Sequence, residues 1–200
     1  RISVLIAGLI MAFSTTVFAA PISVEDAIAE RVMGDPDAPV TIIEYASLTC
    51  GHCANFHKNT MPEIKTKYID TGKAKLILRD FPFDAVSARA AMVARCVDPS
   101  RYLKFMDALF QNQSKWIKQD EQASLQALAA FAKLGGMSEE DFNACVTNEA
   151  ILDGILQRLL EAKQTYEIKA TPSFIIGDDL IEGAMPIEEF DAVISKYLDE

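Results

Sequence analysis

Cys50 and Cys53 are separated by two residues, a spacing that suits a dithiol catalyst of thiol–disulfide exchange. Such a reaction needs one exposed thiol that ionises near neutral pH, because the thiolate is the nucleophile, and a second thiol close enough to resolve the mixed disulfide. If the motif opens a helix, the first thiol lies beside unpaired backbone N–H groups at the positive end of the helix dipole. We therefore predict that Cys50 is the nucleophile and Cys53 the resolving cysteine.

The two residues inside the motif favour an ionised Cys50. Gly51 lets the turn close without side-chain crowding, and a partly protonated imidazole at His52 would add positive potential beside the thiol. Stabilising the thiolate stabilises the reduced form over the disulfide, so the oxidised protein tends to pass its disulfide to a substrate. The motif therefore predicts an oxidant.

An inert disulfide and a zinc site are the alternative interpretations of this motif. Zinc would need a second close pair of ligands, but Cys96 and Cys145 lie far apart in the sequence and His57 is a single candidate. We therefore expect no metal. His57 follows Cys53 by one turn on the same helix face, and we expect it to be solvated and without a role.

The segments around the motif predict a βαβ unit. Residues 40–46 form a β-branched run of strand length that leads into the motif. A helical pattern follows over residues 54–68, with a kink expected at Pro62, and a second strand is predicted over residues 74–79. Two strands joined in this way lie in one sheet, with the Cys50 turn at its carboxyl edge.

The rest of the chain divides into a helical stretch and a hairpin. Residues 84–165 contain no convincing strand pattern, and their spacing and capping signals predict helices. Residues 173–176 and 180–182 predict a β-hairpin, and residues 187–197 a final helix. The order of elements predicts an α/β fold with a helical insertion.

With Thr171-Pro172 placed before this hairpin, the motif and the order of elements resemble the DsbA family of bacterial disulfide oxidoreductases. The resemblance covers most of the chain after the leader and implies a thioredoxin fold. It implies thioredoxin-like parts over residues 39–83 and 166–200, with an inserted helical domain over residues 84–165. It also implies that Pro172 is cis and lies against the redox pair, and that the backbone of Thr171 pairs with bound substrate.

Glu44 lies within the first predicted strand. A carboxylate among apolar neighbours is costly to ionise unless it is solvated or paired, so one interpretation places it at the wet end of the sheet. The DsbA resemblance implies instead a buried acid that relays protons to Cys53. Both interpretations are open at this point.

The four cysteines suggest two disulfides if the protein is exported to an oxidising compartment. Three connectivities exist, but Cys50 and Cys53 are close enough to pair locally, which leaves Cys96 with Cys145. Two free buried thiols are the alternative. A bridge would close a loop of about fifty residues and join the ends of the insertion. A subset of alphaproteobacterial DsbA-like proteins is similar in having a second disulfide.

The first residues have the order of a secretory signal peptide. Arg1 precedes an apolar stretch over residues 2–13, and small residues follow. We predict a signal peptide over residues 1–19 with cleavage after Ala19; an uncleaved membrane anchor is the alternative. Residues 20–38 are expected to form a short, loose leader, and the expected location is the periplasm.

These features together predict a donor of disulfides to reduced secreted or envelope proteins, with no cofactor beyond the redox-active disulfide. A disulfide isomerase or reductase and a non-catalytic peptide-binding module are the alternatives. The resemblance implies reoxidation by a DsbB-like membrane quinone reductase. A net charge of −10 makes nucleic acid a poor partner. A monomer is expected, since the leader is too short for the dimerisation domain of bacterial isomerases.

Overall fold

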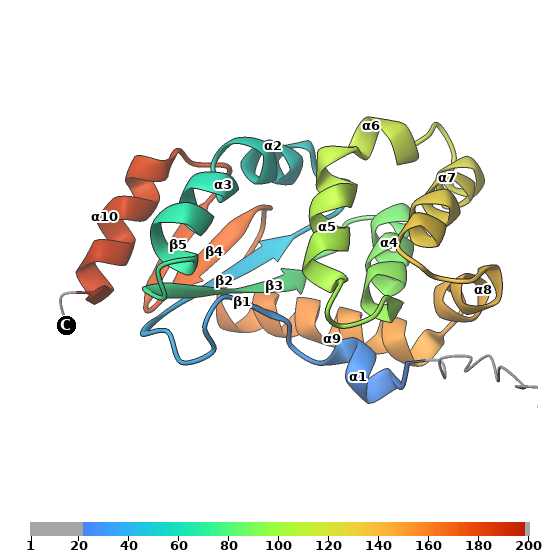
Figure 1. The fold of residues 1–200 in the computed structure, drawn as a ribbon, viewed down its shortest axis with the longest axis horizontal. Coiled ribbons are helices and arrows are strands. Elements are labelled where there is room, and N and C mark those ends of the chain that lie inside the picture. The colour runs from blue at the N-terminus through green and yellow to red at the C-terminus, as the bar shows by residue number, and fades with distance from the viewer. Residues whose placement is uncertain (1–21, 199–200) are drawn as a thin grey trace, which may run out of the picture.

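The computed structural model describes residues 22–198 and shows a mixed sheet with helices on both faces (Figure 1), which confirms the predicted α/β fold. The five strands lie in the order β1-β3-β2-β4-β5. They are β1 (Val32–Met33), β2 (Val40–Ala46), β3 (Ala74–Asp80), β4 (Ser173–Ile176) and β5 (Asp179–Glu182). The helices are α1 (Val24–Ile28), α2 (Gly51–Asn59), α3 (Met61–Ile64), the π-helical turn η1 (Lys65–Ile69), α4 (Ala85–Cys96), α5 (Tyr102–Gln111), α6 (Gln113–Trp116), α7 (Glu121–Leu134), α8 (Glu139–Val146), α9 (Glu149–Thr165) and α10 (Ile187–Leu198).

The strands β2 and β3 form the parallel pair at the centre of the sheet. Their register runs from Val40 opposite Ala74 to Ala46 opposite Asp80. Alternate residues of both strands are buried because one face packs on the main core. Both strands end at the same edge, and β2 leads there to Cys50 at the start of α2. The predicted βαβ unit is confirmed.

The helix after the redox motif is interrupted. One helix was expected over residues 54–68, but α2 ends at Asn59, α3 starts at Met61, and η1 continues to Ile69. Pro62 lies in the first turn of α3, where its missing N–H costs nothing, whereas inside a continuous helix it would remove a hydrogen bond. The kink expected at this proline is therefore confirmed, as a break between two helices.

The hairpin β4–β5 completes the sheet. Antiparallel pairing places Ile43 of β2 opposite Ile175 of β4, so β4 is buried between β2 and β5. Gly177 opens the tight turn at φ +57, a left-handed conformation that suits glycine. The following Asp178 N–H donates to the Tyr197 hydroxyl of α10 at 2.9 Å. Both the hairpin and the final helix were predicted.

Residues 84–165, all of which the structure describes, contain helices and no strand, as predicted. Asp84 and Ser87 form a capping box at the start of α4, and Ser138 caps α8. The insertion shares one hydrophobic core with the sheet, since Tyr102 and Met106 of α5 belong to the same buried cluster as Leu76 of β3. Helix α9 runs across the opposite face of the sheet (Figure 1).

The prediction of a loose leader is wrong for residues 22–38. Ser23 caps α1, which packs on α9, and β1 pairs antiparallel with β3 through Val32 opposite Ile77. A five-residue helix and a two-residue strand are too short to give a periodic pattern, and tertiary contacts stabilise both. The predicted signal peptide and its cleavage site lie outside the described residues. No helix within residues 22–198 is long and apolar enough to cross a membrane.

The structure contains a disulfide between Cys96 at the end of α4 and Cys145 in α8, with their Cα atoms 6.3 Å apart. This confirms the predicted pairing, and the alternative of two free thiols is wrong. The bond joins residues 49 apart in the sequence, so it ties the beginning of the insertion to its later helices.

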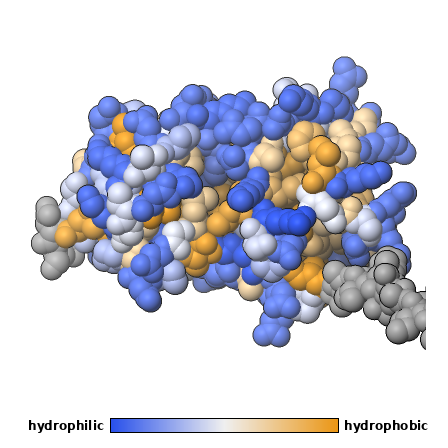
Figure 2. Space-filling view, in the orientation of Figure 1, coloured by the Kyte–Doolittle hydropathy of each residue, from blue (hydrophilic) through white to orange (hydrophobic). Residues whose placement is uncertain are grey.

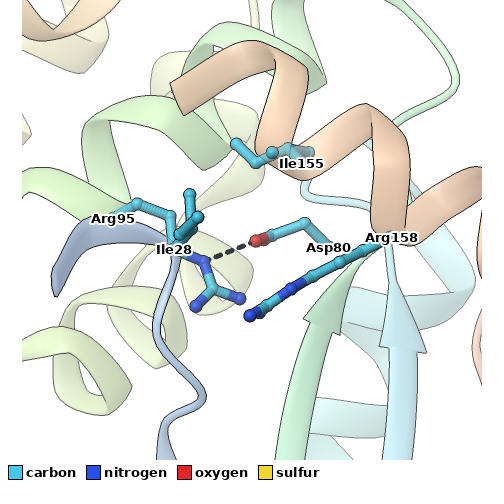
Figure 3. Close-up of a pocket in the computed structure, with 6 residues that line it drawn as sticks. Ile28, Asp80, Arg95, Ile155 and Arg158 are labelled. Carbon is cyan, nitrogen blue, oxygen red and sulfur yellow. Dashed lines mark hydrogen bonds and ion pairs between the residues drawn. The ribbon is translucent and has the colours of Figure 1, made fainter. Parts of the chain in front are cut away.

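A buried ion pair connects the sheet to α4 and α1 (Figure 3). Nε of Arg95 donates to Oδ2 of Asp80 at 2.7 Å, and both side chains are almost completely buried. The remaining guanidinium nitrogens donate to the carbonyl oxygens of Ala29 at 2.9 Å and Leu78 at 3.3 Å. One arginine therefore holds β3 and the segment after α1 against the insertion.

The surface is mostly hydrophilic in the view of Figure 2, in keeping with the net charge of −10. The largest group of hydrophobic side chains on this face lies over the region of α4, α5 and α7. The helical insertion therefore contributes apolar surface on this side.

Candidate active site

Cys50 is the N-cap residue of α2, at the carboxyl edge of the sheet. Its side chain is partly exposed, and its Sγ donates a hydrogen bond to the carbonyl oxygen of Thr171 at 3.3 Å. Cys53 lies one turn along α2 and is fully buried. Both thiols are reduced in this structure. The geometry therefore separates an accessible thiol from a protected one.

The pKa of Cys50 is lowered from 9.0 to about 5. The hydrogen bond from the Cys53 thiol is the largest cause; partial burial opposes it, and the Thr171 hydroxyl and the backbone N–H groups of Cys53 and His52 add to the lowering. The Thr171 hydroxyl has no hydrogen-bond partner among the described residues while Cys50 is protonated, so it is free to donate to the thiolate. His52 contributes through its backbone, and a role for its imidazole stays a prediction.

Cys53 shifts in the opposite direction. Burial raises its pKa far above the ordinary range, and the hydrogen bond to Cys50 and the negative charge of Glu44 raise it further. The reduced protein therefore carries its charge on Cys50. Because a thiol must lose its proton to attack a disulfide, Cys53 needs a nearby group with which to exchange that proton.

We expect the rate at which iodoacetamide alkylates Cys50 to rise with a midpoint near pH 5, because the thiolate is the reactive form. In Cys53→Ala the largest cause of the lowered pKa is removed, so the midpoint should move up toward 9.0. Mass spectrometry of the labelled residue across a pH series gives both curves. A midpoint near 9.0 in the unchanged protein would contradict this assignment.

Thr171 and Pro172 lie against the redox motif. The peptide bond between them is cis, as the DsbA resemblance implies. The next residue, Ser173, begins β4 and pairs with Tyr45 of β2, the strand that leads to the motif. This pairing brings the Thr171 carbonyl to Cys50 across 121 residues of sequence.

Two contacts from the helical insertion hold the turn before α2, and sequence reasoning missed both. Nε2 of Gln113 donates to the carbonyl oxygens of Leu48 at 2.7 Å and Cys50 at 2.9 Å. Oγ1 of Thr49 donates to Oδ2 of Asp84, the N-cap residue of α4, at 2.7 Å. A single glutamine in a helical stretch has no pattern that would mark it. The capping signal at Asp84 could have been found, but not its contact with Thr49.

Glu44 is fully buried in β2, so the interpretation that placed it at the wet end of the sheet is wrong. Its Oε1 lies 2.9 Å from Nε2 of His57, which is itself 4% exposed. The prediction that His57 is solvated is therefore also wrong. Helical periodicity gives the face on which His57 lies, but it does not show that Phe110 of α5 stacks on the imidazole there, with ring centroids 4.1 Å apart.

No group of three or more His, Cys, Asp or Glu side chains within the described part of the chain could hold a metal ion. The polar groups that approach Cys50 are those of Cys53, Thr171 and the start of α2. They suit a thiolate, which is itself the reacting group in thiol–disulfide exchange.

The chain is similar in sequence to proteins whose names refer to disulfide chemistry. A family model described as Thioredoxin matches residues 26–196. A Rickettsia bellii relative named as a protein-disulfide oxidoreductase is 30% identical over 172 residues, covering 86% of this chain and 65% of that protein. Disulfide bond formation protein D of Bacillus subtilis is 25% identical over 181 residues, covering 84% of this chain and 77% of that protein. The chain thus spans just under two thirds of the Rickettsia bellii relative.

Among solved structures, alpha-DsbA1 of Wolbachia pipientis matches with a TM-score of 0.79 and 36% sequence identity, covering 85% of this chain and 91% of that one. This match extends over most of this chain and nearly all of the Wolbachia pipientis chain. The chain therefore belongs to the thioredoxin family and, within it, to the DsbA family.

Proposed function

We propose that the protein is a thiol–disulfide oxidoreductase that donates its Cys50–Cys53 disulfide to reduced client proteins outside the cytoplasm. The observation that carries the proposal is the asymmetry of the two thiols, with the pKa of Cys50 lowered to about 5 and that of Cys53 raised. A stabilised thiolate favours the reduced form, so the oxidised form gives its disulfide away.

The size of this effect follows from the pKa of Cys50. Because the pKa is lowered, the stabilisation of the reduced form is absent below pH 5, grows between pH 5 and 9, and is complete above it. At pH 7 this stabilisation shifts the equilibrium toward the reduced form by up to about a hundredfold, relative to a pair whose first thiol has the ordinary pKa of 9.0. For a two-electron couple, this raises the reduction potential by about 60 mV. Cys50 is partly exposed, so screening by water makes this value an upper limit.

The reaction proceeds by two thiol exchanges. A client thiolate attacks Sγ of Cys50, the Cys50–Cys53 bond breaks, and Cys53 leaves with the electron pair and takes up a proton. A second client thiolate attacks the client sulfur of the mixed disulfide, and Cys50 leaves as a stable thiolate. We assign the proton exchange at Cys53 to Glu44 and the pairing with the client backbone to Thr171. The client is oxidised by two electrons and the protein is reduced by two.

We assign the reduced secreted or envelope proteins as clients and the periplasm as the location, because the chain belongs to the DsbA family. A DsbB-like membrane quinone reductase would restore the disulfide, and the protein would act as a monomer. A disulfide isomerase or reductase remains the alternative within redox chemistry. The direction of exchange separates these functions.

The deciding experiment measures the reduction potential of the Cys50–Cys53 pair. The protein is equilibrated in glutathione buffers at pH 7, and the fraction oxidised is followed by mass spectrometry after acid trapping. We expect a reduction potential more oxidising than that of protein disulfide isomerase, which is about −180 mV. A potential as reducing as that of thioredoxin, about −270 mV, would exclude the oxidase assignment.

A further inference from the structure

The buried pair Glu44–His57 lies beneath the redox motif. Oε1 of Glu44 and Nε2 of His57 are 2.9 Å apart, and the two side chains are 0% and 4% exposed. When Glu44 is ionised, the imidazole N–H donates to the carboxylate. A carboxylate buried without a polar partner is costly, so this hydrogen bond stabilises Glu44 in the core.

The surroundings of this pair are mostly apolar. Glu44 lies between Leu78 of β3 and Phe174 of β4 in the sheet, and Phe110 of α5 stacks on the imidazole with an interplanar angle of 14°. The charge of Glu44 is felt by Cys53 of the redox motif and by Tyr102 of α5. Tyr102 is in turn coupled to Arg31 and to the Asp80–Arg95 ion pair between β3 and α4. His57 is the hydrogen-bond partner of the Glu44 carboxyl among the described residues.

The two oxygens of Glu44 are not equivalent. Oε1 is bound to His57, whereas Oε2 is buried and has no hydrogen-bond partner among residues 22–198. Glu44 is also close enough to Cys53 for its negative charge to raise the pKa of that thiol. An unpaired buried oxygen near a thiol that must gain and lose a proton is available to exchange it.

We propose that His57 is a positioning residue that acts through Glu44: it holds Oε1 in a hydrogen bond and so keeps Oε2 available to exchange a proton with Cys53. The inference rests on the proposed function, since it concerns proton transfer during thiol exchange at Cys50 and Cys53. When Cys53 leaves with the electron pair, it takes the proton from Oε2, and the N–H of His57 stabilises the carboxylate that remains. In the reverse step Cys53 returns the proton to Oε2 as it attacks Sγ of Cys50.

A two-phase reaction with 5,5′-dithiobis(2-nitrobenzoate) separates the two thiols. Attack by Cys50 releases a first coloured thiolate and leaves a mixed disulfide; attack by Cys53 on Sγ of Cys50 then releases the second. The first phase tests the nucleophile, and with it the proposed function, whereas the second phase tests proton removal from Cys53. Both are followed by absorbance between pH 5 and 9.

In His57→Leu we expect the second phase at pH 6 to slow by about a hundredfold, the lower end of what a positioned acid or base contributes, with the first phase unchanged. The remaining rate should rise about tenfold per pH unit, because Cys53 then loses its proton to hydroxide. His57→Gln, whose amide N–H can reach Oε1, should restore most of the rate. His57→Asn is too short to reach it and should behave like His57→Leu, which keeps the test valid if the leucine variant does not fold.

Gln111→Ala is the matched control. Its amide donates to the backbone carbonyl of His57 at 3.1 Å, so the substitution removes a contact between α5 and α2 without touching the imidazole. We expect both phases to be unchanged in this variant. An unchanged second phase in both His57→Leu and His57→Asn would overturn the proposal, as would equal slowing of both phases. Loss of the first phase in the unchanged protein would instead refute the proposed function.

Discussion

Cys50→Ser and Cys53→Ser are both expected to lose all measurable oxidation of a reduced dithiol peptide, but only Cys53→Ser is expected to form a mixed disulfide with the disulfide form of that peptide and to stop there. The first variant lacks the accessible thiol at the start of α2, where the pKa is lowered to about 5. The second keeps that thiol but lacks the buried one that displaces a bound client. A serine hydroxyl in either position cannot form or break a disulfide.

The first readout is the fraction of reduced peptide that stoichiometric oxidised protein converts to its disulfide. The second is gel analysis, under non-reducing conditions, of the complexes trapped when the reduced variants are mixed with the disulfide form of the peptide. Neither variant should oxidise the reduced peptide. With the disulfide form of the peptide, Cys50→Ser should give no complex, whereas Cys53→Ser should give complexes that reductant releases. A protein that only binds peptides would keep its peptide affinity in Cys50→Ser and would show no oxidation in the unchanged form. That outcome would replace the catalytic assignment with the binding-module alternative.

Asp80→Ala is expected to lower the free energy of unfolding by about 3–5 kcal/mol, since it leaves the guanidinium of Arg95 buried without its carboxylate. The ion pair drawn in Figure 3 joins side chains that are 4% and 2% exposed, so little water can reach the guanidinium that is left behind. The measurement is urea denaturation followed by circular dichroism, with the slope of the transition checked for constancy.

Two further variants show whether the unpaired charge is the cause. Asp70→Ala removes the carboxylate of an ion pair with Lys65 in which both side chains are half-exposed, and should cost less than about 1 kcal/mol. Asp80→Leu combined with Arg95→Met removes both charges and should recover much of the loss. A loss below about 1 kcal/mol in Asp80→Ala would show that the pair contributes little to stability.

The sequence predicted those parts of the site that depend on local order. The β-branched run before Cys50 and the strand that ends at Asp80 predicted the βαβ unit, because period-two burial and a crossover helix leave few other arrangements. The spacing of Cys50 and Cys53 predicted an exposed nucleophile and a resolving cysteine about one helix turn apart, whereas the complete burial of Cys53 was not predicted. The cis bond before Pro172 came from family resemblance, because an X-Pro bond is cis in only about 5% of cases.

The parts that the sequence did not predict depend on which elements meet in space. His57 is buried because α5 covers that face of α2, and nothing within one turn of the histidine indicates a helix that begins 45 residues later. Gln113 reaches the redox turn for the same reason. The helix α1 and strand β1 are too short to have periodicity of their own and form through contacts with α9 and β3.

The two edges of the sheet bear on aggregation. The edge strand β1 is only two residues long, and the opposite edge strand β5 has four residues and carries Asp179 and Glu182. Long, flat, apolar edges pair with extended segments of other chains, whereas short or charged edges resist such pairing. A protein proposed to meet unfolded, cysteine-bearing chains would thus offer them little backbone to extend into a shared sheet. Such chains would therefore be held mainly by the mixed disulfide at Cys50, which is covalent but reversible.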